Sequence, residues 1–107
     1  MKILATLAVG ILATQSALAG EEITINRVIG EEFPGRYKHP ATLEELDNGD
    51  LYIAYYGGLG EYEGDTAVYG MRLEKGATEW SKPQIIADTP GRSEGNGAIW
   101  QGPDGRV

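Results

Sequence analysis

The sequence of 107 residues contains no cysteine, so no disulfide stabilises it and no thiol can bind a metal or act as a nucleophile. It has one histidine, His39, and therefore no Cys/His set with the spacing of a metal site. It also has no glycine loop of the kind that cradles phosphate and no Ser-His-Asp order. We expect no metal and no cofactor.

Positive charge is scarce. Nine lysine and arginine residues face sixteen aspartate and glutamate residues, which gives a formal net charge of −7 at pH 7. Phosphate backbones and anionic lipid surfaces are bound by basic faces, which this composition does not supply. We therefore expect neither a nucleic-acid partner nor an anionic membrane partner.

The long apolar run in the chain is confined to its beginning. Lys2 supplies a short positive region, 3–13 is almost wholly apolar, and Ala17-Leu18-Ala19 has the small-x-small pattern of a cleavage site. Residues 1–19 are thus predicted to be a signal peptide. We expect a periplasmic or extracellular protein that leaves the membrane once this peptide is removed.

No stretch after the leader has the length and period of a helix, and a β-hairpin organises the chain instead. Its strands are expected at 39–46 and 51–58, joined by a turn at 47–50. Asn48-Gly49 between apolar runs predicts a tight primed turn, because both residues tolerate positive φ. Both faces of 51–58 are apolar, so we expect both to be covered.

Further strands are expected on either side of this hairpin, and the spacing contains a repeat. Alternation and turn signals place them at 21–29, 66–74 and 80–88, with another beginning at 96–101. Residues 39–44 align with 96–101, and Asn48-Gly49 aligns with Asp104-Gly105, at an offset of 56 or 57 residues. This is the size of one four-stranded propeller blade with its connection, and repeats near fifty residues suggest propellers or solenoids.

The leader and this repeat together divide the chain into four parts. These are a signal peptide at 1–19, a lead-in at 20–38, a first blade at 39–88, and a connection with the start of a second blade at 89–107. The chain is therefore predicted to be the N-terminal fragment of a longer protein, or the product of a truncated gene model. One blade alone lacks neighbours to cover its faces, so this part is not expected to turn over substrate by itself.

The stretch 72–80 resembles a degenerate Asp box, the Ser-x-Asp-x-Gly-x-x-Thr-Trp repeat of sialidases. Gly76 and Trp80 match, and Glu74 stands in for the aspartate. In such a box the acid accepts backbone N–H groups of the turn, and the glycine takes the positive-φ position.

The order of the surrounding motifs strengthens the resemblance. Tyr37-Lys38-His39-Pro40-Ala41 lies where the sialidase family has an aromatic-Arg-Ile-Pro-Ala motif. Residues 57–69 and Gly95-Asn96-Gly97 are similar to motifs of a branch described as predicted neuraminidases. The resemblance covers about residues 33 to 107. It implies a six-bladed β-propeller, of which this chain holds the first blade and the start of the second.

The resemblance further implies a secreted, sialidase-like exo-glycosidase that acts on acidic glycans. Lys38 occupies the slot of an arginine that binds the substrate carboxylate. Glu61 and Asp65 lie on the loop that carries the acid/base residue, and are the candidate catalytic residues. His39 and Asn96, at the start of the two blades, are candidates for binding substrate.

Each candidate also has a structural interpretation. His39 could make a structural hydrogen bond to the neighbouring blade, Asp65 could cap a turn, and the loop acids could bind Ca²⁺. Two other functions stay open. One is a propeller polysaccharide lyase, in which histidine and tyrosine move protons, and the other is a non-catalytic glycan-binding propeller.

Overall fold

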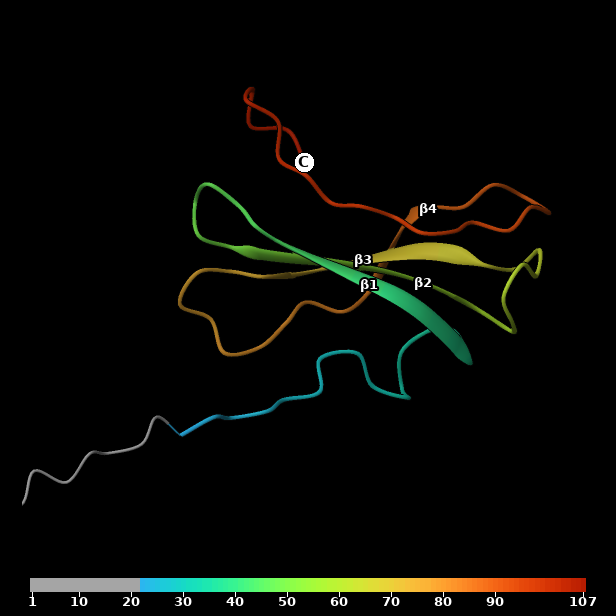
Figure 1. The fold of residues 1–107 in the computed structure, drawn as a ribbon, viewed down its shortest axis with the longest axis horizontal. Coiled ribbons are helices and arrows are strands. Elements are labelled where there is room, and N and C mark those ends of the chain that lie inside the picture. The colour runs from blue at the N-terminus through green and yellow to red at the C-terminus, as the bar shows by residue number, and fades with distance from the viewer. Residues whose placement is uncertain (1–21) are drawn as a thin grey trace, which may run out of the picture.

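The computed structural model describes residues 22–107, which form one four-stranded antiparallel sheet (Figure 1). Each strand pairs with the next along the chain, and the strands are β1 (Tyr37–Glu45), β2 (Leu51–Gly58), β3 (Ala67–Leu73) and β4 (Gln84–Ala87). The described part of the chain contains no helix, so the predicted all-β class is confirmed. The predicted signal peptide, 1–19, lies outside the described residues.

The turn between β1 and β2 lies where it was predicted, but it is not a primed turn. The Leu46 amide donates to the Asp50 carbonyl at 2.8 Å, and the Gly49 amide donates to the Leu46 carbonyl at 2.7 Å. A type I′ turn needs two residues with positive φ, and here only Gly49, with φ of 84°, has one. Asn48 instead accepts the Asp50 amide with its side-chain oxygen at 3.0 Å. The result is a three-residue loop closed by a left-handed glycine.

The first strand begins at Tyr37, two residues before the predicted start, and continues through a proline. His39 pairs with Tyr56, and the register then shifts between His39 and Ala41. Pro40 has no N–H to donate to the ladder, and proline is tolerated in an edge strand or at a bulge. Here β1 is an edge strand, and Pro40 lies at the bulge. The bulge keeps β1 paired along its length and leaves Tyr37 and His39 beside each other.

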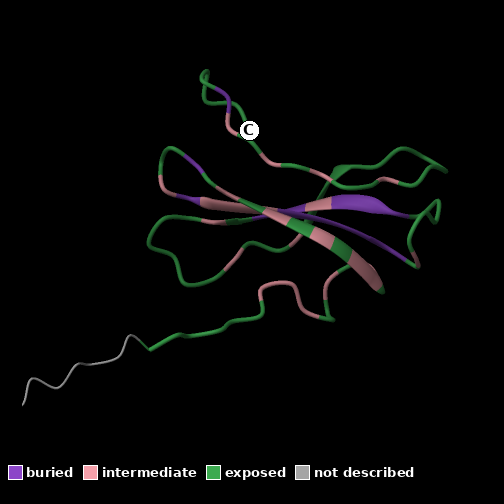
Figure 2. Cartoon of the chain, viewed as in Figure 1, coloured by how far each residue is buried: buried purple, intermediate pink, exposed green. Residues whose placement is uncertain are grey.

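One face of β2 is covered by the C-terminal part of the chain. Ala54, Tyr56 and Val68 form a buried cluster, and Tyr37 and Ile99 pack against it. Figure 1 shows the orange-red segment that contains Ile99 running along this side of the sheet. Figure 2 shows that the buried residues concentrate on β2 and β3, the two inner strands.

The opposite face of β2 is covered by the segment that precedes β1. The rings of Tyr55 and Tyr69 stack with centroids 5.2 Å apart and planes 19° apart. The Tyr55 hydroxyl donates to the Pro34 carbonyl at 3.3 Å, which ties the lead-in to the sheet. Both faces are thus covered along the second half of β2, residues 54–58, whereas Leu51, Tyr52 and Ile53 are only partly buried.

The third and fourth strands are confirmed but shorter than predicted. The expected strand at 66–74 is β3, and the expected strand at 80–88 is reduced to the four residues of β4. Pro83 directly precedes β4 and cannot donate to the ladder, so the paired part starts after it. β4 is an edge of the sheet, where a neighbouring proline is tolerated.

Two other predicted strands are wrong. Residues 22–29 of the expected lead-in strand do not pair with another strand, and the side chains of Ile23 and Ile25 are exposed. Residues 96–101 also form no strand. Alternation makes a segment suitable for a sheet, but a strand exists only where a second backbone pairs with it. Neither segment has such a neighbour within the described residues.

The turn that follows 96–101 nevertheless repeats the first hairpin turn. The Gly102 amide donates to the Arg106 carbonyl at 2.8 Å, and the Gly105 amide donates to the Gly102 carbonyl at 2.9 Å. The Asp104 side chain accepts the Arg106 amide at 3.3 Å, and Gly105 has φ of 81°. All three bonds have counterparts in the first turn at the predicted offset of 56 residues. The sequence repeat is thus also a repeat of local structure.

Candidate functional site

A small pocket of about 220 Å³ lies where β1 begins and β2 ends. Three segments that are distant in the sequence line it: His39 near the start of β1, the end of β2 and the loop after it with Tyr56, Glu61 and Tyr62, and the connection at 94–96. The antiparallel register brings the first two segments together, because the start of β1 pairs with the end of β2.

Aromatic side chains form one wall of this pocket. The rings of His39 and Tyr56 meet edge to face, with centroids 6.1 Å apart and planes at 87°. Tyr37 lies 6.2 Å from each of these two rings. Tyr56 is only 3% exposed and His39 is exposed, so the wall has a rigid base and an accessible rim.

The loop between β2 and β3 presents Glu61 to the pocket and is held by its other polar residues. The Asp65 carboxylate accepts the Leu59 amide at 3.1 Å, which closes the loop at its base. The hydroxyl of Thr66, a fully buried residue, donates to the Glu63 carbonyl at 2.6 Å. These bonds fix the loop ends while Glu61 stays exposed near its tip.

The connection after β4 supplies the third side of the pocket. The Glu94 amide donates to the Thr66 carbonyl at 3.1 Å, which docks the connection beside the loop. The Glu94 carboxylate in turn accepts the Thr89 amide at 2.7 Å. Asn96 follows two residues later and lines the pocket.

The structure brings together three of the five predicted site residues. His39, Glu61 and Asn96 all line the pocket, although they come from three separate segments. Asp65 is bound to the Leu59 amide and acts as the clamp of its loop. Lys38 lies between Tyr37 and His39, whose rings share one side of β1, so its side chain leaves from the opposite side.

The Glu61 carboxylate acts on two tyrosines in or beside the pocket. Burial is the main cause that raises the pKa of Tyr37 to about 12, and the Tyr56 hydroxyl and the charge of Glu61 add to it. The pKa of Tyr62 is also raised, first by the charge of Glu61 and then by a contact with its carboxylate. Both tyrosines are therefore neutral hydroxyl donors at neutral pH.

Sequence reasoning missed Glu94 and Tyr62 as pocket residues. Residues 89–95 read as a polar connection, and nothing local shows that the Glu94 amide docks on the Thr66 carbonyl. Tyr62 has φ of 67°, and it is the sole residue other than glycine with positive φ in the described range. An available signal was the aromatic residue directly after Glu61 in a glycine-rich loop.

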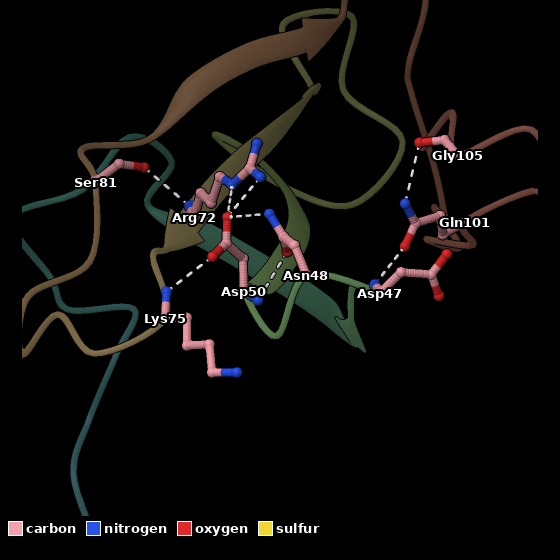
Figure 3. Close-up of polar contacts among 8 residues, drawn as sticks. All are labelled: Asp47, Asn48, Asp50, Arg72, Lys75, Ser81, Gln101 and Gly105. Carbon is pink, nitrogen blue, oxygen red and sulfur yellow. Dashed lines mark hydrogen bonds and ion pairs between the residues drawn. The ribbon is translucent and has the colours of Figure 1, made fainter.

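A second, larger hollow of about 570 Å³ lies over the Asp-box stretch, with Trp80 among its lining residues. Gly76 has φ of 84°, as the resemblance implies. The acid that accepts a turn amide is Asp50, from the first hairpin turn, which receives the Lys75 amide at 2.8 Å (Figure 3). Among residues 22–107 the Glu74 carboxylate accepts no turn amide, so the expectation for Glu74 is corrected.

Within residues 22–107, no group of three histidine or acidic side chains is close enough to hold a metal ion. The same range has no helix long and apolar enough to cross a membrane. No protein-family model, curated protein or solved structure matches the chain.

Proposed function

We propose that the chain belongs to an exported carbohydrate-active β-propeller that acts as an exo-glycosidase, with its substrate in the pocket of His39, Glu61 and Asn96. The observation that carries this proposal is their convergence from three segments onto one hollow lined by tyrosine rings. Aromatic faces, a carboxyl group and an amide are the groups with which proteins bind sugars. Glycoside hydrolysis in turn needs a carboxyl group beside the scissile bond.

The propeller assignment is supported by two features of the sheet. Four antiparallel strands in sequential order are the build of one blade. The turn at 102–106 repeats the turn at 46–50 bond for bond, which is the behaviour of a second copy of the same unit. The leader at 1–19 supports export, to the periplasm or the extracellular space.

In this proposal Glu61 is the general acid, which protonates the glycosidic oxygen as the bond breaks. Its position near the tip of a clamped loop gives it access to a bound sugar. Asn96 donates to or accepts from sugar hydroxyls, and His39 contacts the substrate from the rim. Asp65, although predicted as catalytic, serves the reaction by holding the loop.

Acidic glycans are the substrate that the resemblance implies, through a pairing of Lys38 with a sugar carboxylate. In this chain the Lys38 side chain leaves β1 on the side away from the pocket. An acidic substrate at this pocket therefore needs a cation from another part of the protein. The test below therefore compares acidic with neutral glycans.

A polysaccharide lyase is a second candidate, favoured by the edge-to-face contact of His39 with Tyr56. A lyase needs a base to remove a proton next to a uronate carboxylate and an acid to protonate the leaving oxygen, and histidine and tyrosine can do both. Its product carries a carbon–carbon double bond that absorbs in the near ultraviolet, whereas a hydrolase product does not.

The test is an assay of the full-length protein on sialylated, uronate-bearing and neutral glycans, with detection of both reducing ends and ultraviolet absorbance. We expect hydrolysis that falls about 10²- to 10⁴-fold in Glu61→Gln. Glu45→Gln, which removes an equal charge from an exposed site at the far end of β1, is the control and leaves the rate unchanged. Binding of glycan without any product would replace the hydrolase with a non-catalytic glycan-binding propeller.

A further inference from the structure

We propose that Asn96 is a site of spontaneous deamidation, at which its side-chain amide is converted to the acid of aspartate or isoaspartate. Asn48 also precedes a glycine, but the fold protects it from the same reaction. The chain has a third asparagine, Asn26, which precedes an arginine. The reaction needs water and no enzyme, so this proposal stands independently of the proposed function.

Deamidation of asparagine begins with an attack from within the chain. The backbone nitrogen of the following residue loses its proton to the solvent and attacks Cγ of the asparagine. The N–Cγ bond forms, the Cγ–Nδ2 bond breaks, and Nδ2 takes up a proton and leaves as ammonia. Water then opens the five-membered succinimide at either carbonyl, which gives aspartate or isoaspartate. A following glycine favours the attack, because it has no side chain to obstruct it and its backbone bends freely.

Asn96 meets each requirement of this reaction. It is exposed, it lies between Gly95 and Gly97, and its segment has no regular secondary structure. The hydrogen bonds that dock this connection end at Glu94, and within residues 22–107 neither the Asn96 side chain nor the Gly97 amide takes part in one. No hydrogen bond therefore has to break before the Gly97 nitrogen can reach the Asn96 amide.

Asn48 has the same sequence signal, but the first hairpin turn holds both reacting groups. The attacking nitrogen would be that of Gly49, and it donates to the Leu46 carbonyl at 2.7 Å. The Asn48 side chain is held at both ends by Asp50. It accepts the Asp50 amide at 3.0 Å and donates to the Asp50 carboxylate at 3.1 Å. These bonds must open before the attack, so Asn48 should react far more slowly than Asn96 in the folded chain.

Deamidation of Asn96 changes the pocket that this residue lines. Glu61 and Glu94 line the same pocket, so the product adds a third carboxyl group there. An amide that both donates and accepts becomes a carboxylate that only accepts. In isoaspartate the backbone also passes through the former side chain. This lengthens the segment between the docked Glu94 and Ile99, which packs on the sheet.

The experiment follows the three asparagines in one sample. The full-length protein is kept in mildly alkaline buffer, and peptide mapping by mass spectrometry measures the conversion of each asparagine over time. We expect Asn96 to react at least about tenfold faster than Asn48, because each hydrogen bond that must open first slows the reaction several-fold. Asn26 is exposed but followed by Arg27, so it should also react more slowly than Asn96. In concentrated urea, Asn48 and Asn96 should react at similar rates, because the turn no longer protects Asn48.

Gly97→Ala tests the role of the following glycine. A Cβ at Gly97 would lie 3.6 Å from Cγ1 of Val68, which is an ordinary contact, and Gly97 is not among the glycines with positive φ. The fold should therefore be kept, while the conversion of Asn96 slows several-fold and that of Asn48 and Asn26 is unchanged. Equal rates at Asn48 and Asn96 in the folded protein overturn the proposal. So does an Asn96 that reacts no faster than Asn26, or one that stays intact in the folded protein while Asn48 reacts in urea.

Discussion

Asp50, in the first hairpin turn, accepts the Nε–H of Arg72 in β3 at 2.7 Å, although the two residues lie 22 positions apart in the chain. The same carboxylate accepts the Lys75 amide at 2.8 Å and an N–H of the Asn48 side chain at 3.1 Å (Figure 3). Asp50 is buried, so these donors replace the water that its charge would otherwise bind. One acid thus joins the β1–β2 turn to the β3–β4 connection.

Replacing Asp50 should lower the stability of the fold, because both turns lose contacts. Asp50→Asn keeps the shape of the side chain but removes its charge, and the Arg72 guanidinium loses its anion. We expect the melting temperature of the purified protein to fall by roughly 5–10 °C. Asp47→Asn is the matched control, since Asp47 is exposed in the same turn, and it should change the melting temperature by less than about 2 °C. Equal effects of the two variants would show that the Asp50 contacts contribute nothing.

The same network predicts a dependence of stability on acid pH. The Lys75 amide, and after it the Arg72 guanidinium, lower the pKa of Asp50 from its usual value of 3.8. A carboxyl group with a lowered pKa in the folded state stabilises that state above its unfolded pKa, and this contribution is lost as pH falls below it. The stability difference between the wild type and Asp50→Asn should be constant above about pH 5 and shrink as pH drops through 3.8. Urea unfolding between pH 3 and 7 measures it, and a difference that grows on acidification would contradict it.

Turns were the most predictable part of this fold, because their chemistry is local. Asn48-Gly49 and Asp104-Gly105 both form the predicted turns, and in each the glycine takes the positive φ. The turn type was wrong for the first, since Asn48 bonds the Asp50 amide with its side chain instead of taking positive φ itself. Residue identity therefore located the turns, and side-chain bonding selected their geometry.

Strand length and the composition of the pocket depend on partners that local sequence does not reveal. Residues 96–101 have a suitable pattern but no paired backbone, so they form no strand. His39, Glu61 and Asn96 were identified by resemblance, and their convergence follows from the register of β1 on β2 and from the docking of Glu94 on Thr66. Glu94 lines the pocket because its amide bonds to the Thr66 carbonyl, and no sequence motif indicates that contact.

Two glycines with similar φ provide a test of how closely the lead-in approaches the sheet. Gly35 has φ of +94°, and a Cβ there would lie 2.8 Å from the Gly57 Cα and 2.9 Å from the Tyr37 carbonyl oxygen. Gly76 has φ of +84° but no atom within 4 Å of such a Cβ. Gly76→Ala should therefore cost only the strain of a left-handed alanine, about 1 kcal/mol, whereas Gly35→Ala should cost at least about 2–3 kcal/mol. Chemical unfolding of both variants decides this, and equal losses would mean that the lead-in does not pack on β2 as described.

Tyr55 predicts a loss of stability at alkaline pH. Burial, and then the neighbouring Tyr69, raise the pKa of Tyr55 to about 12 from the ordinary value of 10.0. A raised pKa means that the contribution to stability is complete below pH 10 and is lost as pH rises towards 12. Tyr55→Phe loses the hydrogen bond to the Pro34 carbonyl, which should cost about 1 kcal/mol at pH 7–9, but it has no phenol to ionise. The stability curves of wild type and variant should therefore converge above pH 10 and cross before pH 12, because a shift of two pKa units is worth more than the roughly 1 kcal/mol of the hydrogen bond. Curves that stay parallel over that range would mean that the Tyr55 phenol ionises as easily in the folded chain as in the unfolded one.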